Sequence, residues 1–233
     1  LPIPLPLPPL PPQQVANLAR GMCAPAWAAE GRGCPYGHKI PVPFSTLTWP
    51  TTPSALDYVA IFYSSMPLFA VTALAVSILW KRGLREVATL VMVIIVNIIT
   101  VVLKAVFSQL RPAGSCLTSC GMPSGHSSFS ASLATLLLLE MQGRVHGRTR
   151  LAMSLAVAAL LFPVPWSRYH LRDHSLSQVL AGSSLGVGAA ILWFAMMRCV
   201  FAAHAPAVAS KAVVLVDNYS QDTELEPIIR ARD

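Results

Sequence analysis

The chain has 233 residues, of which 54% are hydrophobic and 12% are charged, and its formal net charge is +7. A soluble domain carries about twice that charged share, so the composition excludes an ordinary soluble protein and predicts a multi-pass membrane protein. The positive charge does not indicate binding to nucleic acid. The basic residues lie in short segments between apolar runs and form no basic face interleaved with aromatic residues.

The chain begins with a proline-rich stretch, LPIPLPLPPLPPQQ. Repeated proline favours an extended, polyproline-like conformation without a packed core. The stretch has no charged n-region followed by an unbroken apolar segment, so it is not typical of a signal peptide. We therefore expect residues 1–54 to form a disordered N-terminal arm ahead of a transmembrane domain at residues 55–204.

Five apolar runs follow the arm. A helix needs roughly 17–25 residues to cross a bilayer, and a spanning segment must be helical because its backbone groups find no partners in lipid. We expect a kink at Pro67 in the first run, and the third run is the shortest. The expected spans are residues 56–80, 87–110, 124–141, 150–166 and 176–200.

The loops between these spans predict the orientation of the chain. The loop after the first span reads KRGLRE and the loop after the third reads GRVHGRTR, so two Lys/Arg-rich loops lie on one side. The positive-inside rule assigns that side to the cytoplasm, together with a mainly polar tail at residues 205–233. Asn218 begins an N-glycosylation acceptor pattern in this tail, but the glycosylation machinery does not reach the cytoplasm, and we expect no glycan there.

The loops after the second and fourth spans then face the lumen or the exterior. They contain Arg111, Arg168 and Arg172, although the positive-inside rule disfavours basic residues on that side. Their presence there requires a local reason, such as a bound anion.

The five cysteines match no zinc spacing. Cys116 and Cys120 share the loop after the second span, and Cys23 and Cys34 lie in the arm. An extracytoplasmic location would allow disulfides. The sequence leaves their pairing open, and a Cys116–Cys120 bond is one alternative.

The first polar stretch of interest is KAVFSQLRP, in which Lys104 and Arg111 are seven residues apart. This spacing is about two helical turns, so both cations would project from one helix face. Two cations at a membrane boundary can clamp a phosphate, for which the guanidinium offers bidentate contact. Taken alone, the pair is better explained by side chains that snorkel to lipid headgroups.

The second stretch is GMPSGHSSFSAS, where Pro and Gly place a tight turn before the third span. The unpaired N–H groups at such a helix start form an anion site. Ser124 adds a hydroxyl donor, and His126 can transfer protons near neutral pH. On its own, this pattern is more often an ordinary helix cap.

The third stretch is SRYHLRDHSLSQVLAG, residues 167–182. His174 and Gln178 are four residues apart, so on a helix the amide could accept a hydrogen bond from one ring nitrogen. The other nitrogen would then be free to attack phosphorus. Arg168 lies at the start of the same stretch, after the fourth span.

Three other polar residues of this stretch have no clear place in a site. Asp173 would not face the next residue on a regular helix. We expect His170 and Arg172 to be loop residues or headgroup contacts.

The three stretches together carry more information than each one alone. Lys-x6-Arg-Pro, Pro-Ser-Gly-His and Ser-Arg-x5-His occur in this order and on one side of the membrane. This combination resembles the type 2 phosphatidic acid phosphatase superfamily, over residues 55–197. The resemblance implies an all-α, multi-pass transmembrane helical bundle with a phosphatase core, and an activity that needs no metal or other cofactor.

The resemblance also implies a role for each motif residue. In that family the Lys and Arg of the first motif hold phosphate oxygens, which maps onto Lys104 and Arg111. The Ser and Gly of the second motif bind phosphate through a hydroxyl and a backbone N–H, which maps onto Ser124 and Gly125. The His of the second motif is the general acid for the leaving group, here His126.

In the third motif of the family the Arg adds a phosphate contact, here Arg168, and the His becomes phosphohistidine, here His174, before water hydrolyses the intermediate. These roles are physically consistent, because three cations and helix N–H groups can neutralise the charge of a phosphoryl group. One His must be neutral to attack while the other is protonated to donate, and a bell-shaped pH profile follows.

One position departs from the family pattern. The family usually has Asp four residues after the nucleophile, whereas this chain has Gln178. HSLSQVLAG is similar to the dolichyldiphosphatase branch of the family, although that branch commonly has Ser where this chain has Gly125. The resemblance therefore implies a polyisoprenyl diphosphate lipid, dolichyl diphosphate, as substrate. It further implies an endoplasmic reticulum membrane location, a lumenal active site, and recycling of the lipid carrier used in protein N-glycosylation.

Two alternatives stay open at this point. One is a broad-specificity lipid phosphate phosphatase that acts on phosphatidate, lysophosphatidate or sphingoid phosphates. The other is a catalytically silent lipid-phosphate binder, against which the two retained histidines argue. Transport has no support, because no span carries an acidic pair or repeated charge in mid-membrane. The expected partners are the bilayer and the lipid substrate, and the sequence leaves the oligomeric state open.

Overall fold

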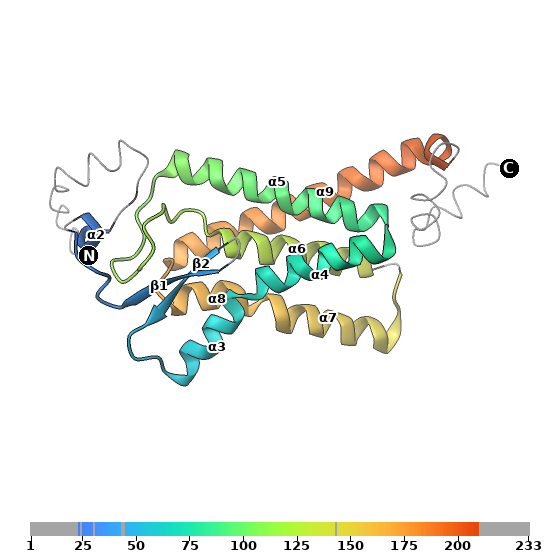
Figure 1. The fold of residues 1–233 in the computed structure, drawn as a ribbon. Helices are drawn as coiled ribbons and strands as arrows, with labels where there is room; N and C mark the ends of the chain where they lie inside the picture. The colour runs from blue at the N-terminus through green and yellow to red at the C-terminus, as the bar shows by residue number, and fades with distance from the viewer. Residues whose placement is uncertain (1–22, 24, 30, 43–44, 143, 210–233) are drawn as a thin grey trace, which may run out of the picture.

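Long helices run side by side through the molecule, and a small β-hairpin lies against one end of them (Figure 1). The computed structural model describes residues 23, 25–29, 31–42, 45–142 and 144–209. The expectation of a transmembrane helical bundle is confirmed. The hairpin is an addition to the all-α architecture that the sequence predicts.

The first expected span is a pair of helices, α3 (Ala55–Ser64) and α4 (Met66–Lys81). Ser54 caps α3 through a capping box with Asp57, which satisfies donors at the helix start. The break falls at Ser65, because Pro67 has no N–H and is best tolerated in the first turn of the new helix. The predicted kink near this proline is confirmed.

The second expected span is α5 (Leu84–Phe107), which ends at Ser108 with a left-handed φ of 42°. We expected the helix to continue to residue 110, with the two cations of the first motif on one helix face. That expectation is wrong, because Lys104 lies in the last turn of α5 whereas Arg111 lies in the loop that follows.

The third expected span is α6 (Gly125–Met141), which lies at the centre of the bundle and contacts α4, α5, α7, α8 and α9. Its 17 residues rise about 25 Å. Among the described residues, four helical segments are long and apolar enough to cross a membrane: Ala55–Lys81, Leu84–Phe107, Gly147–His170 and Leu176–Cys199. The shorter α6 is enclosed by these segments, which explains why its many serines are buried rather than exposed to lipid.

The last part of the bundle contains α7 (Gly147–Leu161), α8 (Pro163–His170) and α9 (Leu176–Ala209). Helix α9 packs closely on α6 because two of its residues have no side chain. A Cβ at Gly182 would lie 2.4 Å from the carbonyl oxygen of Ser124, and one at Gly186 would lie 2.3 Å from that of Ser128. Helix α9 continues past the boundary that we expected at residue 204, and Asn218 lies outside the described residues.

The N-terminal part of the chain differs from the expected disordered arm. It contains α2 (Ala26–Ala29) and an antiparallel hairpin of β1 (Gly37–Val42) and β2 (Ser45–Pro50). For the described part of this segment, residues 23, 25–29, 31–42 and 45–50, the prediction of disorder is wrong. The proline-rich residues 1–22, on which that prediction was based, lie outside the described residues.

Two disulfides hold this segment against the bundle. Cys23 pairs with Cys120, and Cys34 pairs with Cys116. The alternative of a bond within the α5–α6 loop, between Cys116 and Cys120, is therefore wrong. Each bond instead joins the α5–α6 loop to the N-terminal segment, and these covalent links give the segment a fixed place that its composition does not reveal.

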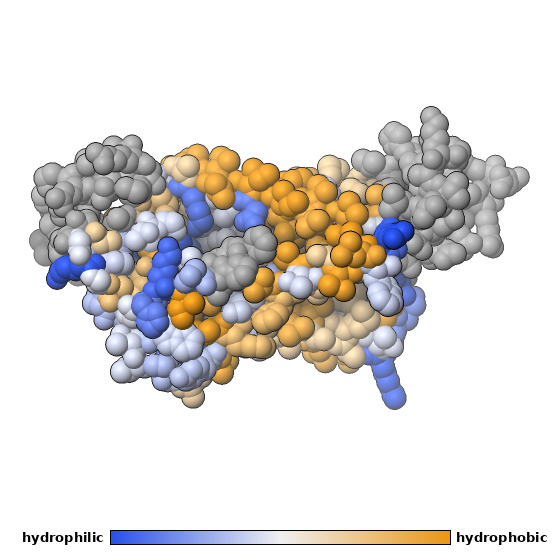
Figure 2. All heavy atoms as spheres, viewed as in Figure 1, coloured by the Kyte–Doolittle hydropathy of each residue, from blue (hydrophilic) through white to orange (hydrophobic). Residues whose placement is uncertain are grey.

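The surface is divided into an apolar middle and two polar ends. Figure 2 shows hydrophobic residues across the middle of the molecule and hydrophilic residues gathered at both ends. Helix α5 illustrates the apolar part, with exposed Ile94, Ile98, Val101 and Val102. The hairpin lies at one end, and the α4–α5 and α6–α7 connections lie at the other (Figure 1). The two basic loops therefore share one end, as the sequence predicts.

Candidate active site

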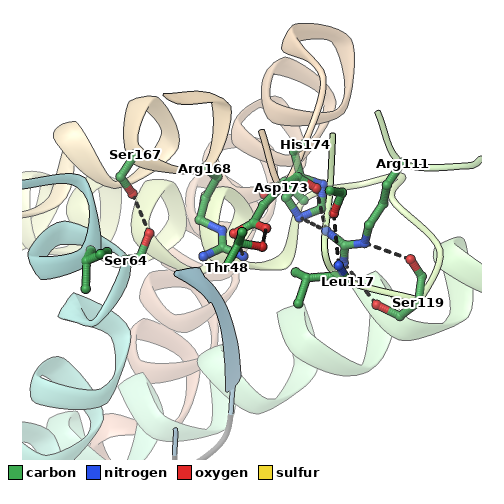
Figure 3. A network of polar contacts seen from close by, with 12 residues as sticks. Thr48, Ser64, Arg111, Leu117, Ser119, Ser167, Arg168, Asp173 and His174 are labelled. Atoms are coloured by element: carbon green, nitrogen blue, oxygen red, sulfur yellow. Dashed lines mark hydrogen bonds and ion pairs between the residues drawn. The ribbon is translucent and has the colours of Figure 1, made fainter. Parts of the chain in front are cut away.

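The three motif stretches meet at the hairpin end of the bundle. The α5–α6 loop carries Arg111, the start of α6 follows that loop, and the turn between α8 and α9 carries Asp173 and His174 (Figure 3). Segments more than 60 residues apart in sequence are joined here by hydrogen bonds between residue 111 and residues 173 and 174.

The cations of the first motif meet although one of them lies outside the helix. Lys104 donates from Nζ to the carbonyl oxygen of Cys120 at 2.8 Å. Arg111 donates from Nε to the carbonyl oxygen of Ser119 at 2.7 Å and from Nη2 to its hydroxyl at 3.0 Å. Both side chains are thus held by adjacent residues of the α5–α6 loop.

Arg111 also contacts the third motif. Its Nη1 donates to the carbonyl oxygen of Asp173 at 2.6 Å and lies 3.0 Å from Nε2 of His174. Burial lowers the pKa of the guanidinium to about 10, with the nearby Asp173 opposing the shift and Arg168 adding to it. Arg111 therefore stays charged at neutral pH, and it faces the ring nitrogen that would attack phosphorus.

The side-chain amide of Gln178 has one orientation, because two backbone groups determine it. Nε2 lies 2.8 Å from the carbonyl oxygen of Leu110, which can only accept, and Oε1 lies 3.2 Å from the N–H of Ser175, which can only donate. Nε2 also donates to Oε1 of Gln109 at 3.0 Å. The amide oxygen must therefore face His174.

This orientation selects the tautomer of His174. Nδ1 lies 3.2 Å from Oε1 of Gln178, so it carries the proton and donates it. Nε2 is then the acceptor, which agrees with the Arg111 donor beside it. The predicted contact between His174 and Gln178 is present, although α9 begins only at Leu176 and the His lies in the preceding turn.

The surroundings of His174 favour its neutral form. The side chain is 2% exposed. Burial, together with the positive charges of Arg111, Arg168 and Lys104, holds the pKa of this imidazole well below its ordinary value near 6.5. A neutral ring with an unprotonated Nε2 is the form that can act as a nucleophile at neutral pH.

Arg168 lies in α8 with its side chain 1% exposed. Its Nη2 lies 2.8 Å from Oδ2 of Asp173. Its buried Nε and Nη1 have no hydrogen-bond acceptor among the residues that the structure describes. A buried guanidinium with unused donors is suited to bind the oxygens of an anion.

The start of α6 provides the second motif. Ser124 is the N-cap and accepts a hydrogen bond from the Ser127 N–H at 3.4 Å. Its own N–H donates to the carbonyl oxygen of Gln178 at 3.0 Å, which ties α6 to α9. Gly125 and His126 occupy the first turn, where backbone N–H groups lack intrahelical acceptors.

The electrostatic environment of His126 places it beside the other site residues. The imidazole lies close enough to Lys104, Arg111, Arg168 and His174 for their charges to interact. The structure therefore gathers all eight residues that the sequence singled out: Lys104, Arg111, Ser124, Gly125, His126, Arg168, His174 and Gln178.

The structure adds residues that the sequence did not assign to the site. Asp173, to which the sequence assigned no role beyond not facing His174 on a regular helix, contacts both arginines. Ser119 and Gln109 hold Arg111 and Gln178, respectively. Thr48 reaches Asp173 from strand β2. Among these added residues, Asp173 alone had a local sequence signal for a role in the site, because it is an acidic residue within a cluster of cations.

Two other polar residues of the third motif lie beside the site. His170 is the last residue of α8, with Nε2 2.9 Å from Oδ1 of Asp57, and its ring stacks on Trp166. The expectation of a loop position is therefore wrong for His170, and a headgroup contact stays a prediction. Arg172 does lie in the turn, as expected, with a φ of 57° and its guanidinium over the ring of Tyr36.

The described residues contain no group of three or more His, Cys, Asp or Glu side chains arranged to hold a metal ion. The positive charges of the site are those of Lys104, Arg111 and Arg168, and the carboxylate of Asp173 lies beside Arg168.

The model of the PAP2 superfamily matches residues 85–201 of the chain. The chain is 29% identical over 162 residues to dolichyldiphosphatase 1 of Homo sapiens, which covers 64% of this chain and 68% of that protein. It is 26% identical over 147 residues to dolichyldiphosphatase 1 of Dictyostelium discoideum, which covers 60% of this chain and 64% of that protein.

A solved structure is similar in fold. It is the first transmembrane PAP2 type phosphatidylglycerolphosphate phosphatase from Bacillus subtilis, with a TM-score of 0.56 and 17% sequence identity. The match covers 64% of this chain and 80% of that chain.

Proposed function

The chain belongs to the PAP2 superfamily, and we propose that it is a membrane phosphatase that converts dolichyl diphosphate into dolichyl phosphate and inorganic phosphate. The observation that carries the proposal is the fixed state of His174. Gln178 holds the proton on Nδ1, and Nε2 faces the buried cations of the site. A neutral, oriented imidazole next to several guanidinium donors is suited to attack a phosphoryl group.

In the proposed reaction Nε2 of His174 attacks the terminal phosphorus atom in line with the bridging oxygen. The P–O bond to the lipid phosphate breaks while the N–P bond forms. His126 gives its proton to the leaving oxygen. Arg111 donates to Nε2 of His174, and in this mechanism a phosphate oxygen takes over that donor and frees the lone pair.

The second half of the reaction reverses the roles. Water attacks phosphorus in the phosphohistidine, and His126 takes its proton. The N–P bond breaks, and inorganic phosphate leaves. Lys104, Arg111, Arg168 and the backbone N–H of Gly125 neutralise the charge that develops on the phosphoryl oxygens in both steps.

The substrate proposal rests on Gln178 and on the relatives. The amide supplies the oxygen that orients His174, without the negative charge of the Asp that is usual in the family. The curated relatives that share this similarity are named dolichyldiphosphatase 1. We therefore place the protein in the endoplasmic reticulum membrane with its active site on the lumenal face, where it would recycle the carrier lipid of N-glycosylation.

The test is phosphate release by the purified full chain in detergent micelles that contain EDTA. Dolichyl diphosphate, phosphatidate, lysophosphatidate and a sphingoid phosphate are compared at equal mole fraction, with His174→Ala as the control for contaminating phosphatases. We expect the highest kcat/KM for dolichyl diphosphate. A preference for phosphatidate would replace the proposal with a broad-specificity phosphatase, and no release from any lipid would indicate a silent binder.

A further inference from the structure

Asp173 connects the two arginines of the site. Its carboxylate pairs with Arg168, with 2.8 Å between Nη2 and Oδ2. Its carbonyl oxygen accepts a hydrogen bond from Nη1 of Arg111 at 2.6 Å. One residue thus contacts both guanidinium groups, directly before the proposed nucleophile.

Asp173 is turned toward Arg168 by the backbone of the α8–α9 turn. Arg172 has a φ of 57°, so the chain reverses direction immediately before Asp173. The N–H of His174 closes the turn by donating to the carbonyl oxygen of Arg168 at 3.1 Å. The same turn therefore determines the direction of the Asp173 carboxylate and the position of the His174 imidazole.

The second oxygen of this carboxylate is bound by the N-terminal hairpin. Oδ1 of Asp173 accepts a hydrogen bond from the hydroxyl of Thr48 in strand β2. Figure 3 shows Thr48 beside both Asp173 and Arg168. The exposed fractions are 2% for Thr48, 0% for Asp173 and 1% for Arg168, so the three polar groups are enclosed together.

The position of Thr48 is itself fixed by the hairpin and the disulfides. Thr48 lies opposite Lys39 in the antiparallel ladder. The preceding part of the segment is bonded to the α5–α6 loop through Cys23 and Cys34, and the Trp27 indole donates to the carbonyl oxygen of Ser115 at 3.2 Å. The segment is thereby held against the loop that carries Arg111.

We propose that Asp173, held by Thr48, is a positioning residue for both phosphate-binding arginines, so that strand β2 of the N-terminal segment completes the active site. This inference rests on the proposed phosphatase function. A buried guanidinium with two unused donors needs a fixed direction to bind phosphate bidentately. The Thr48 hydroxyl and the Asp173 carboxylate supply that direction from outside the three motifs.

The test compares variants of Thr48 in the purified full chain. Thr48→Val removes the hydroxyl at nearly constant shape, and Thr48→Ser retains it. Thr46→Val is the matched control, because Thr46 lies two residues earlier on the same face of β2. Loss of a hydrogen bond to a charged group should lower kcat/KM by about 10-fold or more in Thr48→Val. Thr48→Ser and Thr46→Val should stay within about twofold of the wild type, as neither loses that bond.

Asp173→Asn separates positioning from simple charge. Removing a negative charge from the site should strengthen the binding of inorganic phosphate if only Coulomb attraction matters. If Asp173 positions the arginines, the neutral amide binds Arg168 less firmly and the inhibition constant of inorganic phosphate rises. The same direction is expected for Thr48→Val, which leaves all charges in place and remains a test if Asp173→Asn does not fold.

Phosphate binding is measured both as product inhibition and as the rise of Tm on adding inorganic phosphate. Wild-type kcat/KM and phosphate affinity in Thr48→Val, or tighter phosphate binding in Asp173→Asn, would overturn the inference. A wild-type protein that hydrolyses no lipid phosphate would instead refute the proposed function. The rise of Tm with phosphate still decides the inference in that case, because it does not depend on turnover.

Discussion

Replacing Gln178 tests how the nucleophile is oriented. The amide makes contacts with His174, Ser175, Leu110 and Gln109, at distances between 2.8 and 3.2 Å. Gln178→Leu removes all of them and leaves the ring free to place its proton on Nε2, which cannot attack. Selection of the wrong imidazole tautomer costs up to about 10⁴ in kcat in a serine protease, and we expect a loss of about 10²–10⁴ here.

Gln178→Glu is a finer perturbation. One carboxylate oxygen can still accept from the N–H groups of His174 and Ser175, so the tautomer is retained. The other oxygen replaces a donor and meets the carbonyl oxygen of Leu110, previously 2.8 Å from Nε2, and Oε1 of Gln109. A lost hydrogen bond with a buried acceptor left unpaired predicts a kcat/KM about 10–100-fold lower.

Gln178→Glu should also change the pH dependence of kcat/KM. Burial and the surrounding cations hold the pKa of His174 well below 6.5, so the acid limb of wild-type kcat/KM should lie below pH 6.5. His174 is active when neutral, and protonation removes activity as pH falls through its pKa. A carboxylate at position 178 stabilises the imidazolium and raises that pKa, so the acid limb of Gln178→Glu should move to higher pH.

The assay is a pH profile of kcat/KM for phosphate release from dolichyl diphosphate. Gln142→Glu, at the opposite end of α6, is the control for adding a carboxylate to the protein. An unaffected Gln178→Leu enzyme, or an acid limb that does not move in Gln178→Glu, would refute the role of the amide.

Three further predictions concern other parts of the site. His126→Ala should lower kcat by about 10²–10⁴ with a lipid leaving group, and by much less with an aryl phosphate, whose leaving group needs no proton; equal losses would contradict a general acid. Gly182→Ala should lower stability by about 1–3 kcal/mol, because its Cβ would lie 2.4 Å from a carbonyl oxygen at the start of α6, whereas Gly188→Ala, inside α9, meets no atom within 4 Å and should not lower Tm. Reduction of both disulfides should lower kcat/KM together with Tm, because Cys120 accepts the Lys104 hydrogen bond; a fully reduced enzyme with normal kinetics would refute this link.

The bundle could be predicted from the sequence because a helix that crosses lipid must be apolar over the thickness of the bilayer. Apolar length marks the spans, and Pro67 marks the break between α3 and α4. Helix α6 is the exception to this rule. It carries buried serines and is too short for the same rule, yet it forms the centre because other helices cover it. Its role in the bundle depends on its neighbours rather than on its own hydropathy.

The proximity of the three motifs was also predictable, but the contacts that join them were not. Lys104 and Arg111 meet because both reach the α5–α6 loop, whereas the helical spacing that suggested their proximity ends at Phe107. Asp173 faces Arg168 because the turn at Arg172 replaces the regular helix that we assumed.

The N-terminal segment could not be placed from its own residues. Hairpin pairing and disulfide connectivity depend on contacts between distant segments, and four cysteines allow three pairings that sequence cannot distinguish. The hydrogen bond from Thr48 to Asp173 joins residues 125 apart and has no local signal at all.

The central claim is that His174 becomes phosphorylated during turnover. The direct measurement is acid-free quenching of the full chain during hydrolysis of dolichyl diphosphate labelled in its terminal phosphate, followed by peptide mapping. We expect acid-labile, base-stable label on His174 in the wild type, more of it in His126→Ala if hydrolysis of the intermediate slows, and none in His174→Ala. Label on another residue, or full turnover by His174→Ala, would contradict the account.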